Sequence, residues 1–337
     1  MADPADATRT LIIRELDVLR RKEEQDRNPF KARAYGKVIQ QLRDYVGPPI
    51  RTLADLDGVT GIGAKIREKI GEILATGHLE AASEIRRATD LPRKEFWATI
   101  YGVGPVKANE IAAIRPPLET YEDLRRAVVA TPGLLNDKQK IGLKYAEDTV
   151  LRIPRAEMDA HAVRIISAVR AVSPDFTAEI VGSYRRGMPD SGDIDVLLTL
   201  PAHTSAAVRK QRFTALCEHL IADGYVTDTL AKGDKKYLGY CRQAPNLPAR
   251  RLDLLMTPKE EYPYALIYFT GSDRFNVAMR QKALTLGYTL NEHALTPLAG
   301  AEPAPAPPTM ETEQDVFRFL QMTYLPPAQR IVGQPAA

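Results

Sequence analysis

The sequence predicts a multidomain α+β protein, helical over about its first 150 residues and built on a mixed β-sheet after them. Two observations predict this division. Over residues 10–150, apolar residues such as Leu16 and Leu19 recur at intervals of three and four, the spacing of one helical face. From about Arg155 the pattern changes to short runs rich in β-formers, with helical segments between them. We therefore expect a domain boundary near Arg155.

The composition excludes several classes of protein. The chain has 337 residues, 44% hydrophobic and 26% charged, which is ordinary for two to four globular domains. No apolar run approaches the ~18 residues of a membrane-spanning helix, so we expect no membrane association. Cys217 and Cys241 have no partners at metal-ligand spacing, which favours a reducing compartment. The acidic first residues argue against a cleaved leader peptide.

The elements after Arg155 follow from local patterns. Three short runs are expected to be strands: 178–182, 193–200 and 251–256. Residues 206–223 have a helical pattern, and 311–324 form a second expected helix. The alternating Ala and Pro of residues 299–308 predict an extended surface loop.

Two glycine loops in the helical half repeat one pattern. Their key residues are Gly61, Gly63 and Lys65 in the first loop, and Gly102, Gly104 and Lys107 in the second. Each loop follows one helical segment and opens another, as in a helix-hairpin-helix, where backbone amides at a helix N-terminus approach a phosphate. A single loop could equally be a tight turn between packed helices. Two copies favour sequence-independent contact with the DNA backbone, although the net charge of +3 by itself indicates nothing.

Three acidic residues lie on the expected strands. Asp193 and Asp195 point to the same side of a strand, close enough to share divalent metal ions. Asp253 stands alone in an apolar run, where an ionised carboxylate is costly unless it binds a metal or pairs with a base. A single Asp-x-Asp is more often a solvated strand end. Together the three suit two-metal phosphoryl transfer, and donors for a triphosphate lie nearby at Ser183, Arg186, Ser191 and Gly192.

These motifs resemble those of the family X DNA polymerases, of the DNA polymerase beta type, over roughly residues 11–332. The segments that carry the resemblance are 182–195, 227–233, 268–276 and 279–280. The resemblance implies a helical lyase domain, a helical DNA-binding subdomain, a nucleotidyltransferase palm and a small α+β subdomain for nucleotide selection. Their expected bounds are 1–88, 89–154, 155–260 and 261–337.

The resemblance also implies a role for each motif. Asp193, Asp195 and Asp253 would bind two Mg²⁺ ions, replaceable by Mn²⁺, and Asp253 would receive the proton of the primer 3′-hydroxyl. Arg155 would join the four triphosphate donors. The nucleotide sugar and base would contact Tyr268, Phe269, Gly271, Asp273 and Asn276. The alternative for this segment is an ordinary helix after a glycine turn, with Phe269 and Phe275 in the core.

DNA contacts are implied for a larger set. It comprises Lys31, Tyr35, Gly61, Gly63, Lys65, Gly102, Gly104, Lys107, Lys232, Arg251 and Arg280. A monovalent cation is expected at the hairpin loops. The resemblance gives Arg280 a contact with the template strand.

Lys65 and Lys69 are four positions apart on one expected helix and therefore share a face. Like charges there disfavour protonation, and a neutral amine is the nucleophile that a Schiff base requires. A solvated basic face is the alternative that composition alone favours. The resemblance implies that Lys69 attacks the aldehyde of a 5′-deoxyribose phosphate (dRP), with Lys31, Tyr35 and Lys65 holding the 5′-phosphate.

Four residues depart from the family pattern. Phe30, Asp57 and Ala81 replace basic or polar residues of the phosphate pocket, so we expect weaker lyase activity. Leu255 replaces an arginine that restrains a metal-binding aspartate, so Asp195 is expected to be ready for metal before the enzyme closes.

The predicted function is template-directed gap filling by a monomeric DNA polymerase with dRP lyase activity, in base excision repair. Its substrates would be gapped or nicked DNA and dNTPs. The alternatives are a template-independent terminal transferase and a non-catalytic DNA-binding scaffold. The triad argues against a scaffold, and the lack of an inserted loop in residues 270–276 argues against a terminal transferase. We expect an intracellular location, with a nucleus or viral factory favoured over a bacterial cytosol.

Overall fold

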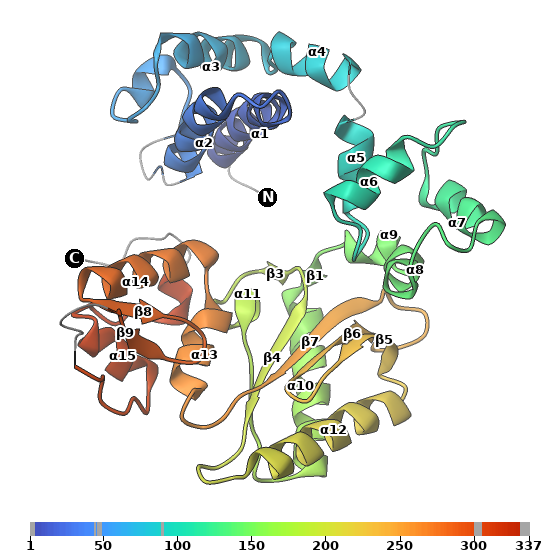
Figure 1. The fold of residues 1–337 in the computed structure, drawn as a ribbon, viewed down its shortest axis with the longest axis vertical. Helices are drawn as coiled ribbons and strands as arrows, with labels where there is room; N and C mark the ends of the chain where they lie inside the picture. The colour runs from blue at the N-terminus through green and yellow to red at the C-terminus, as the bar shows by residue number, and fades with distance from the viewer. Residues whose placement is uncertain (1–3, 44, 46–48, 89–90, 300–304, 331–337) are drawn as a thin grey trace. The chain divides into compact units, whose positions relative to one another are not determined.

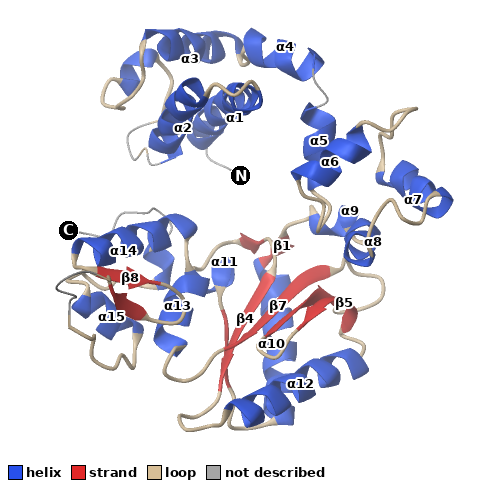
Figure 2. Ribbon diagram, viewed as in Figure 1, coloured by secondary structure: helices blue, strands red, loops and turns tan. Residues whose placement is uncertain are grey.

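The computed structural model describes residues 4–43, 45, 49–88, 91–299 and 305–330, which divide into two compact units (Figure 1). The first unit comprises Met1–Thr99 and Val103–Leu124, and the second comprises Ile100–Gly102 and Arg125–Ala337. Among the described residues, strands occur only in the second unit (Figure 2). No helix in these ranges combines the length and apolarity that a membrane span needs.

The first unit is helical, as the sequence predicts. Its elements are α1 (Pro4–Gln25), α2 (Pro29–Arg43), η1 (Leu53–Leu56), α3 (Ala64–Thr76), α4 (Glu80–Ala88), α5 (Leu91–Ala98) and α6 (Pro105–Ala112). Residues at three- and four-residue spacing, such as Ile12 and Leu16 of α1 and Ile70 of α3, are buried in one core. α7 (Tyr121–Ala130) crosses from this unit into the second.

The second unit contains the mixed sheet. Before and within the sheet region lie α8 (Asp137–Lys144), α9 (Ala146–Thr149), β1 (Ile153–Pro154), α10 (Arg155–Val172), β2 (Thr177–Ile180), α11 (Gly182–Arg185), β3 (Asp190–Ser191), β4 (Ile194–Thr199), α12 (Ala206–Ala222), β5 (Val226–Lys232), β6 (Lys236–Cys241) and β7 (Arg250–Met256). The strand order is β2-β4-β7-β6-β5, in which β4 and β7 are parallel and the other neighbours antiparallel. β1 and β3 form a separate two-stranded pair.

The two faces of the sheet have different partners. Side chains that alternate along β4 and β7, such as Val196 and Leu254, pack with α10 and α12 in the main core. The intervening residues Leu197 and Leu255 point the other way and pack against α13 (Tyr262–Thr270). Asp195 and Asp253 share the parity of these residues, so their side chains leave the sheet on the α13 side and avoid the main core.

The C-terminal part of the second unit is a small α+β assembly, as predicted. After α13 it contains α14 (Asp273–Thr285), β8 (Tyr288–Leu290), β9 (Leu295–Pro297), α15 (Glu313–Phe319) and η2 (Pro327–Gln329). Phe275, Met279 and Phe317 are buried in its core. The β8–β9 pair is antiparallel and separate from the main sheet.

Most predicted elements are present with shifted ends. The change to mixed structure falls where the sequence places it, because β1 begins at Ile153 and α10 at Arg155. The helix expected over 311–324 is shorter, and β5 and β6 were not predicted as strands. Of the expected loop, residues 305–308 have no regular structure, and 300–304 lie outside the described residues. The division into four domains stays a prediction.

Candidate active site

The three predicted acids lie next to one another at one end of the parallel strand pair. β4 and β7 are neighbours in a register that sets Asp195 directly opposite Asp253. Asp193 lies two residues before Asp195, immediately ahead of β4. The sheet therefore brings together residues that are separated by about 60 positions in the sequence.

Arg251, which lies on β7, is placed among these acids. Arg251 donates a hydrogen bond from Nη2 to Oδ2 of Asp193, and its Nε is 3.6 Å from Oδ1 of Asp253. Arg251 Nε and Asp253 Oδ1 are both buried without a hydrogen-bond partner. In the described part of the chain, no three His, Cys, Asp or Glu side chains are close enough to hold a metal ion. Where we expected an open metal cage, the guanidinium of Arg251 lies among the acids.

Burial and mutual repulsion act strongly on the acids. Burial, followed by the charges of Asp193 and Asp253, raises the pKa of Asp195 to about 7. Burial also raises the pKa of Asp253. Burial alone would lower the pKa of Arg251, but the three carboxylates raise it. The cluster therefore stabilises a cation, and its all-oxygen donors suit Mg²⁺ or Mn²⁺ once Arg251 moves away from the unpartnered Asp253 oxygen.

A cavity of about 440 Å³ opens in front of Asp193 and Asp195. Its lining comprises Arg152, Gly182, Ser183, Arg186, Gly192, Asp193, Asp195, Tyr268, Phe269, Gly271, Ser272, Asp273 and Asn276. Ser191 does not line the cavity, but its Oγ lies 2.8 Å from Oγ of Ser183, which does. The structure thus joins three of the predicted triphosphate donors, Ser183, Arg186 and Gly192, with the predicted sugar and base contacts in one site.

Gly182 is required by the close approach of α11 to Asp195. It has a φ of +61°, and a Cβ built on it would lie 2.6 Å from Oδ2 of Asp195. A side chain at this position would therefore displace the carboxylate as well as strain the backbone. This close approach places Ser183 and Arg186 beside the acids.

The arginines of the site differ from the prediction at one position. Arg155 does not line the cavity, because its Nη1 donates to the carbonyl of Tyr184 at 2.6 Å and its guanidinium lies 3.9 Å from the centre of that ring. Arg152, which the sequence did not single out, lines the cavity instead. Arg186 lines it as predicted and donates to the Thr270 carbonyl at 2.6 Å.

Why Arg152 was missed is clear from the strand pairing. β1 pairs with β3, so Ile153 lies opposite Ser191, and Arg152 bonds to Asp190 Oδ1 at 2.6 Å. A strand of two residues has no periodicity that sequence patterns could detect. The proximity of Arg152 to residues 190–192 therefore became visible only in the structure.

The segment on the far side of the cavity supports both interpretations of its sequence. Phe275 is buried in the core as the structural alternative expected, whereas Tyr268, Phe269 and Asn276 line the cavity. The Asn276 amide donates to the Tyr268 carbonyl at 2.8 Å. Arg280, expected to contact the template, lies 5.2 Å from the centre of the Tyr268 ring.

The first hairpin loop has the predicted form. Gly61 has a φ of +90°, and Gly63 caps α3, the helix that carries both Lys65 and Lys69. Lys65 is exposed and Lys69 half-buried on the same helix. A Cβ at Gly61 would lie 3.3 Å from Cδ of Lys37, a cation on α2 that the sequence analysis did not single out.

The residues of the second hairpin loop, and Lys232, have partners within the protein. Gly102 has a φ of +80°, and its carbonyl accepts a hydrogen bond from the Gln139 amide at 2.9 Å. Gly104 caps α6, on which Lys107 pairs with Glu110. Lys232 lies 3.2 Å from Glu218.

The residues that depart from the family pattern have distinct surroundings. Phe30 is 83% exposed, and Ala81 packs against the helical core of the first unit. Asp57 pairs with Arg67 at 2.7 Å. Leu255 packs in the apolar cluster beside α13. The arginine that pairs with the acid cluster is instead Arg251, on the same strand.

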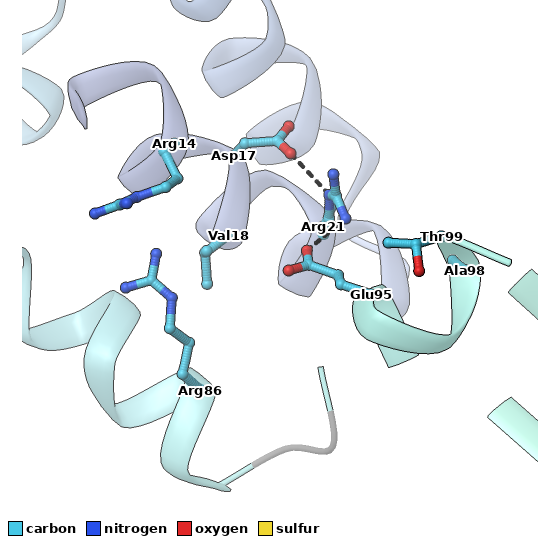
Figure 3. Close-up of a pocket in the computed structure, with 8 residues that line it drawn as sticks. All are labelled: Arg14, Asp17, Val18, Arg21, Arg86, Glu95, Ala98 and Thr99. Atoms are coloured by element: carbon cyan, nitrogen blue, oxygen red, sulfur yellow. Dashed lines mark hydrogen bonds and ion pairs between the residues drawn. The ribbon is translucent and has the colours of Figure 1, made fainter. Parts of the chain in front are cut away.

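A larger hollow lies within the first unit, and none of the predicted site residues lines it. It has a volume of about 680 Å³ and is lined by α1, α4 and α5 (Figure 3). Arg21 bridges Asp17 and Glu95 across it, with distances of 2.7 and 2.6 Å. Arg86 donates a hydrogen bond to the buried carboxylate of Glu15 at 2.9 Å. Because these charges are paired within the unit, we do not place the active site there.

Comparison with known proteins agrees with this geometry. The chain matches family models described as the DNA polymerase beta palm over residues 152–259, the DNA polymerase beta thumb over 265–331, and a helix-hairpin-helix domain over 7–79. It is 32% identical to DNA polymerase lambda of Rattus norvegicus over 95% of its own length and 56% of that protein.

Two further relatives are similar over most of the chain. DNA polymerase lambda of Arabidopsis thaliana is 28% identical over 91% of the chain and 58% of that protein. DNA-directed DNA/RNA polymerase mu of Homo sapiens is 27% identical over 84% of the chain and 61% of that protein. The chain thus spans less than two thirds of the length of these curated relatives.

Proposed function

Because the chain belongs to the family X DNA polymerases, we propose that it is a template-directed DNA polymerase that fills short gaps in duplex DNA. One observation carries the proposal. A single cavity combines two acids of the β4–β7 cluster with phosphate donors on one side and aromatic and amide side chains on the other. Such a cavity suits a nucleoside triphosphate, whose charged and planar ends need different surroundings.

Asp193, Asp195 and Asp253 would hold two Mg²⁺ ions after Arg251 leaves the cluster. When bound, these ions supply activation of a primer 3′-hydroxyl and neutralise charge on the triphosphate. Asp253 is suited to accept the hydroxyl proton, because its Oδ1 has no hydrogen-bond partner and burial raises its pKa. Arg251 is the proposed contact to a DNA phosphate, which would draw it away from the acids.

The other residues of the cavity would orient the nucleotide. Ser183, Arg186, Gly192 and Arg152 are placed to hold phosphate oxygens, and Ser191 orients Ser183 through their hydrogen bond. The sugar would lie against Tyr268, Phe269 and Gly271, and the base beside Asp273 and Asn276. Arg280 would meet the template strand after leaving the Tyr268 ring.

The two hairpin loops would bind the DNA backbone on either side of the gap, with a monovalent cation at the loop carbonyls. Lys65, Lys107 and Lys232 would exchange solvent or acidic partners for phosphates. We propose that the protein acts as a monomer inside the cell, in a nucleus, a viral factory or a bacterial cytosol.

The proposed second activity is dRP lyase chemistry in base excision repair. Lys69 is the candidate nucleophile, supported by its half-buried position on the helix that the first hairpin loop opens. Its amine would attack the aldehyde carbon with loss of water, and β-elimination would then break the bond to the 3′-phosphate. Lys31, Tyr35 and Lys65 would hold the 5′-phosphate.

A pair of variants tests both activities on one substrate, a one-nucleotide gap that ends in a 5′ sugar phosphate. Asp253→Ala should abolish primer extension and leave sugar release and DNA binding nearly intact. Lys69→Ala should abolish borohydride-trapped adducts and leave extension intact. Primer extension by Asp253→Ala would exclude the acid cluster as the site of nucleotide transfer. Undiminished trapping by Lys69→Ala would assign the lyase nucleophile to another lysine.

A further inference from the structure

The turn between α1 and α2 places a carboxylate among the residues proposed to hold the 5′-phosphate. Glu23 lies in the last turn of α1, and Lys31 lies in the first turn of α2. Tyr35 follows Lys31 by four positions, so both lie on one face of α2. The two helices pack against each other (Figure 1). The backbone N–H of Asn28 donates to the backbone carbonyl of Glu23 at 2.8 Å, which fixes the turn.

Both oxygens of this carboxylate have a donor. Oε2 of Glu23 accepts from the side-chain amide of Asn28 at 2.9 Å, and Oε1 lies 3.4 Å from Nζ of Lys31. The Glu23 side chain is 19% exposed and that of Lys31 is 67% exposed. An ammonium and an amide that converge on one anion are the groups that would bind the oxygens of a phosphomonoester.

We infer that Glu23 is an internal anion that competes with a 5′-phosphate for Lys31 and Asn28, and thereby sets the preference of the protein for 5′-phosphorylated DNA ends. The inference rests on the proposed function, because that proposal assigns Lys31 and Tyr35 to the 5′-phosphate. It makes Glu23 a determinant of specificity and gives a physical reason to expect loose 5′-phosphate binding in this chain.

The electrostatic surroundings point the same way. The pKa of Tyr35 is raised by burial and by the negative charge of Glu23, so this carboxylate acts on a second residue proposed to hold the phosphate. A phosphomonoester carries nearly two negative charges at neutral pH, and it would meet this field at a separation of a few ångströms. For a group with two charges about 6 Å away across water, removal of one opposing charge changes affinity by about tenfold.

Glu23→Gln tests the inference directly. Glutamine keeps an oxygen that can accept from Asn28 and removes only the charge, so the turn should persist, and a thermal unfolding curve verifies it. The measurement is the dissociation constant for gapped DNA with a 5′-phosphate and for the same DNA with a 5′-hydroxyl. We expect the preference for the phosphorylated end to rise about tenfold.

Two further variants make the result specific. Glu24→Gln removes the same charge one residue later, from a side chain that pairs with Arg20, and should change both affinities equally. In a Lys31→Ala background, Glu23→Gln should give a smaller gain in preference, because the competition for Lys31 is then gone and only the repulsion by Glu23 and its competition for Asn28 are relieved. The inference is overturned if Glu23→Gln strengthens the binding of both DNAs equally, or if the preference for the 5′-phosphate is unchanged or reduced.

The failure of the proposed function would have a different signature. If the protein is no lyase, borohydride trapping fails in the wild type, yet the preference for phosphorylated ends still responds to Glu23→Gln. If the protein is no polymerase, primer extension fails in the wild type, and the preference for phosphorylated ends again still responds to Glu23→Gln. The reverse outcome, normal trapping with an unresponsive preference, rejects the role of Glu23 alone.

Discussion

Arg152 and Arg155 are three residues apart and have different surroundings. Arg152 lines the cavity and pairs with Asp190, whereas Arg155 is bound to the backbone and ring of Tyr184. The difference arises because Arg152 directly precedes β1, whereas Arg155 is the first residue of α10, so the two side chains leave the backbone from different local conformations. Arg155 is therefore suited to position α11, which carries Tyr184.

Arg152→Ala should raise the KM for the incoming dNTP by about tenfold and change the unfolding temperature little, because it removes one exposed phosphate contact. Arg155→Ala is the matched control. It should raise the KM less than Arg152→Ala does and lower the free energy of unfolding by about 1 kcal/mol, because it removes a hydrogen bond that is only partly buried. Steady-state extension and urea unfolding measure the two effects, and an exchange of the two phenotypes would contradict this assignment.

The residues of the acid cluster show how far sequence reasoning reaches. Strand alternation predicted that Asp193 and Asp195 share a side, and the rarity of an acid in an apolar run identified Asp253. Neither argument shows that Arg251 bonds to Asp193, because that contact depends on the pairing of β4 with β7. The same pattern of alternation that places Asp253 also places Arg251, on the same face two residues earlier.

Among the elements, long periodic segments were predicted and short or polar ones were not. α12 and β4 were found within a residue or two, because their apolar residues repeat over several turns or alternations. β1 and β3 have two residues each, too few for any pattern. β5 has three polar residues in succession, Thr227, Asp228 and Thr229, so it lacks the apolar run that marked β4 and β7. Its pairing with β6 also includes register irregularities.

One ion-pair network connects α11 to the C-terminal elements. Glu313 of α15 accepts from Arg330 at 2.7 Å and from Arg185 of α11 at 2.9 Å. Arg330 is fully buried, and Glu313 is 4% exposed. Burial would raise the pKa of Glu313, but its hydrogen bonds with Arg185 and Arg330 lower it overall. Glu313 thus stabilises the fold above its ordinary pKa, and this contribution is lost as acid protonates the folded protein.

Glu313→Gln should lower the free energy of unfolding at pH 7 by about 3–5 kcal/mol, because the buried Arg330 then loses its carboxylate partner and Arg185 keeps only Glu179. Urea unfolding at pH 7 measures this loss. Glu311→Gln, an exposed position just before the same helix, should cost less than about 0.5 kcal/mol. The difference between wild type and Glu313→Gln should shrink as the pH falls below about 4.5. Equal stability of the two variants at pH 7 would show that the network contributes nothing.

At the scale of the whole molecule, the weak net charge of +3 constrains how DNA can be bound. Such a charge on 337 residues gives little long-range attraction, so affinity must come from local groups such as the hairpin lysines. Binding of this kind releases counterions only where a lysine or arginine meets a phosphate. The salt dependence of affinity therefore counts these contacts, whereas the backbone amides of the hairpins add affinity with little dependence on salt.

The affinity for gapped DNA should fall with added salt, with a slope in logarithmic coordinates of about −0.9 for each phosphate neutralised. Lys65→Ala and Lys107→Ala should each make this slope shallower by about 0.9, because each removes one cation from a proposed phosphate contact. Lys210→Ala is the control, since Lys210 lies in another part of the chain and pairs with Asp234 at 3.0 Å. Fluorescence anisotropy from 50 to 300 mM salt gives the slopes. Equal slopes for the three variants would mean that the hairpin lysines make no contact with phosphate, and that the glycine loops are turns between packed helices.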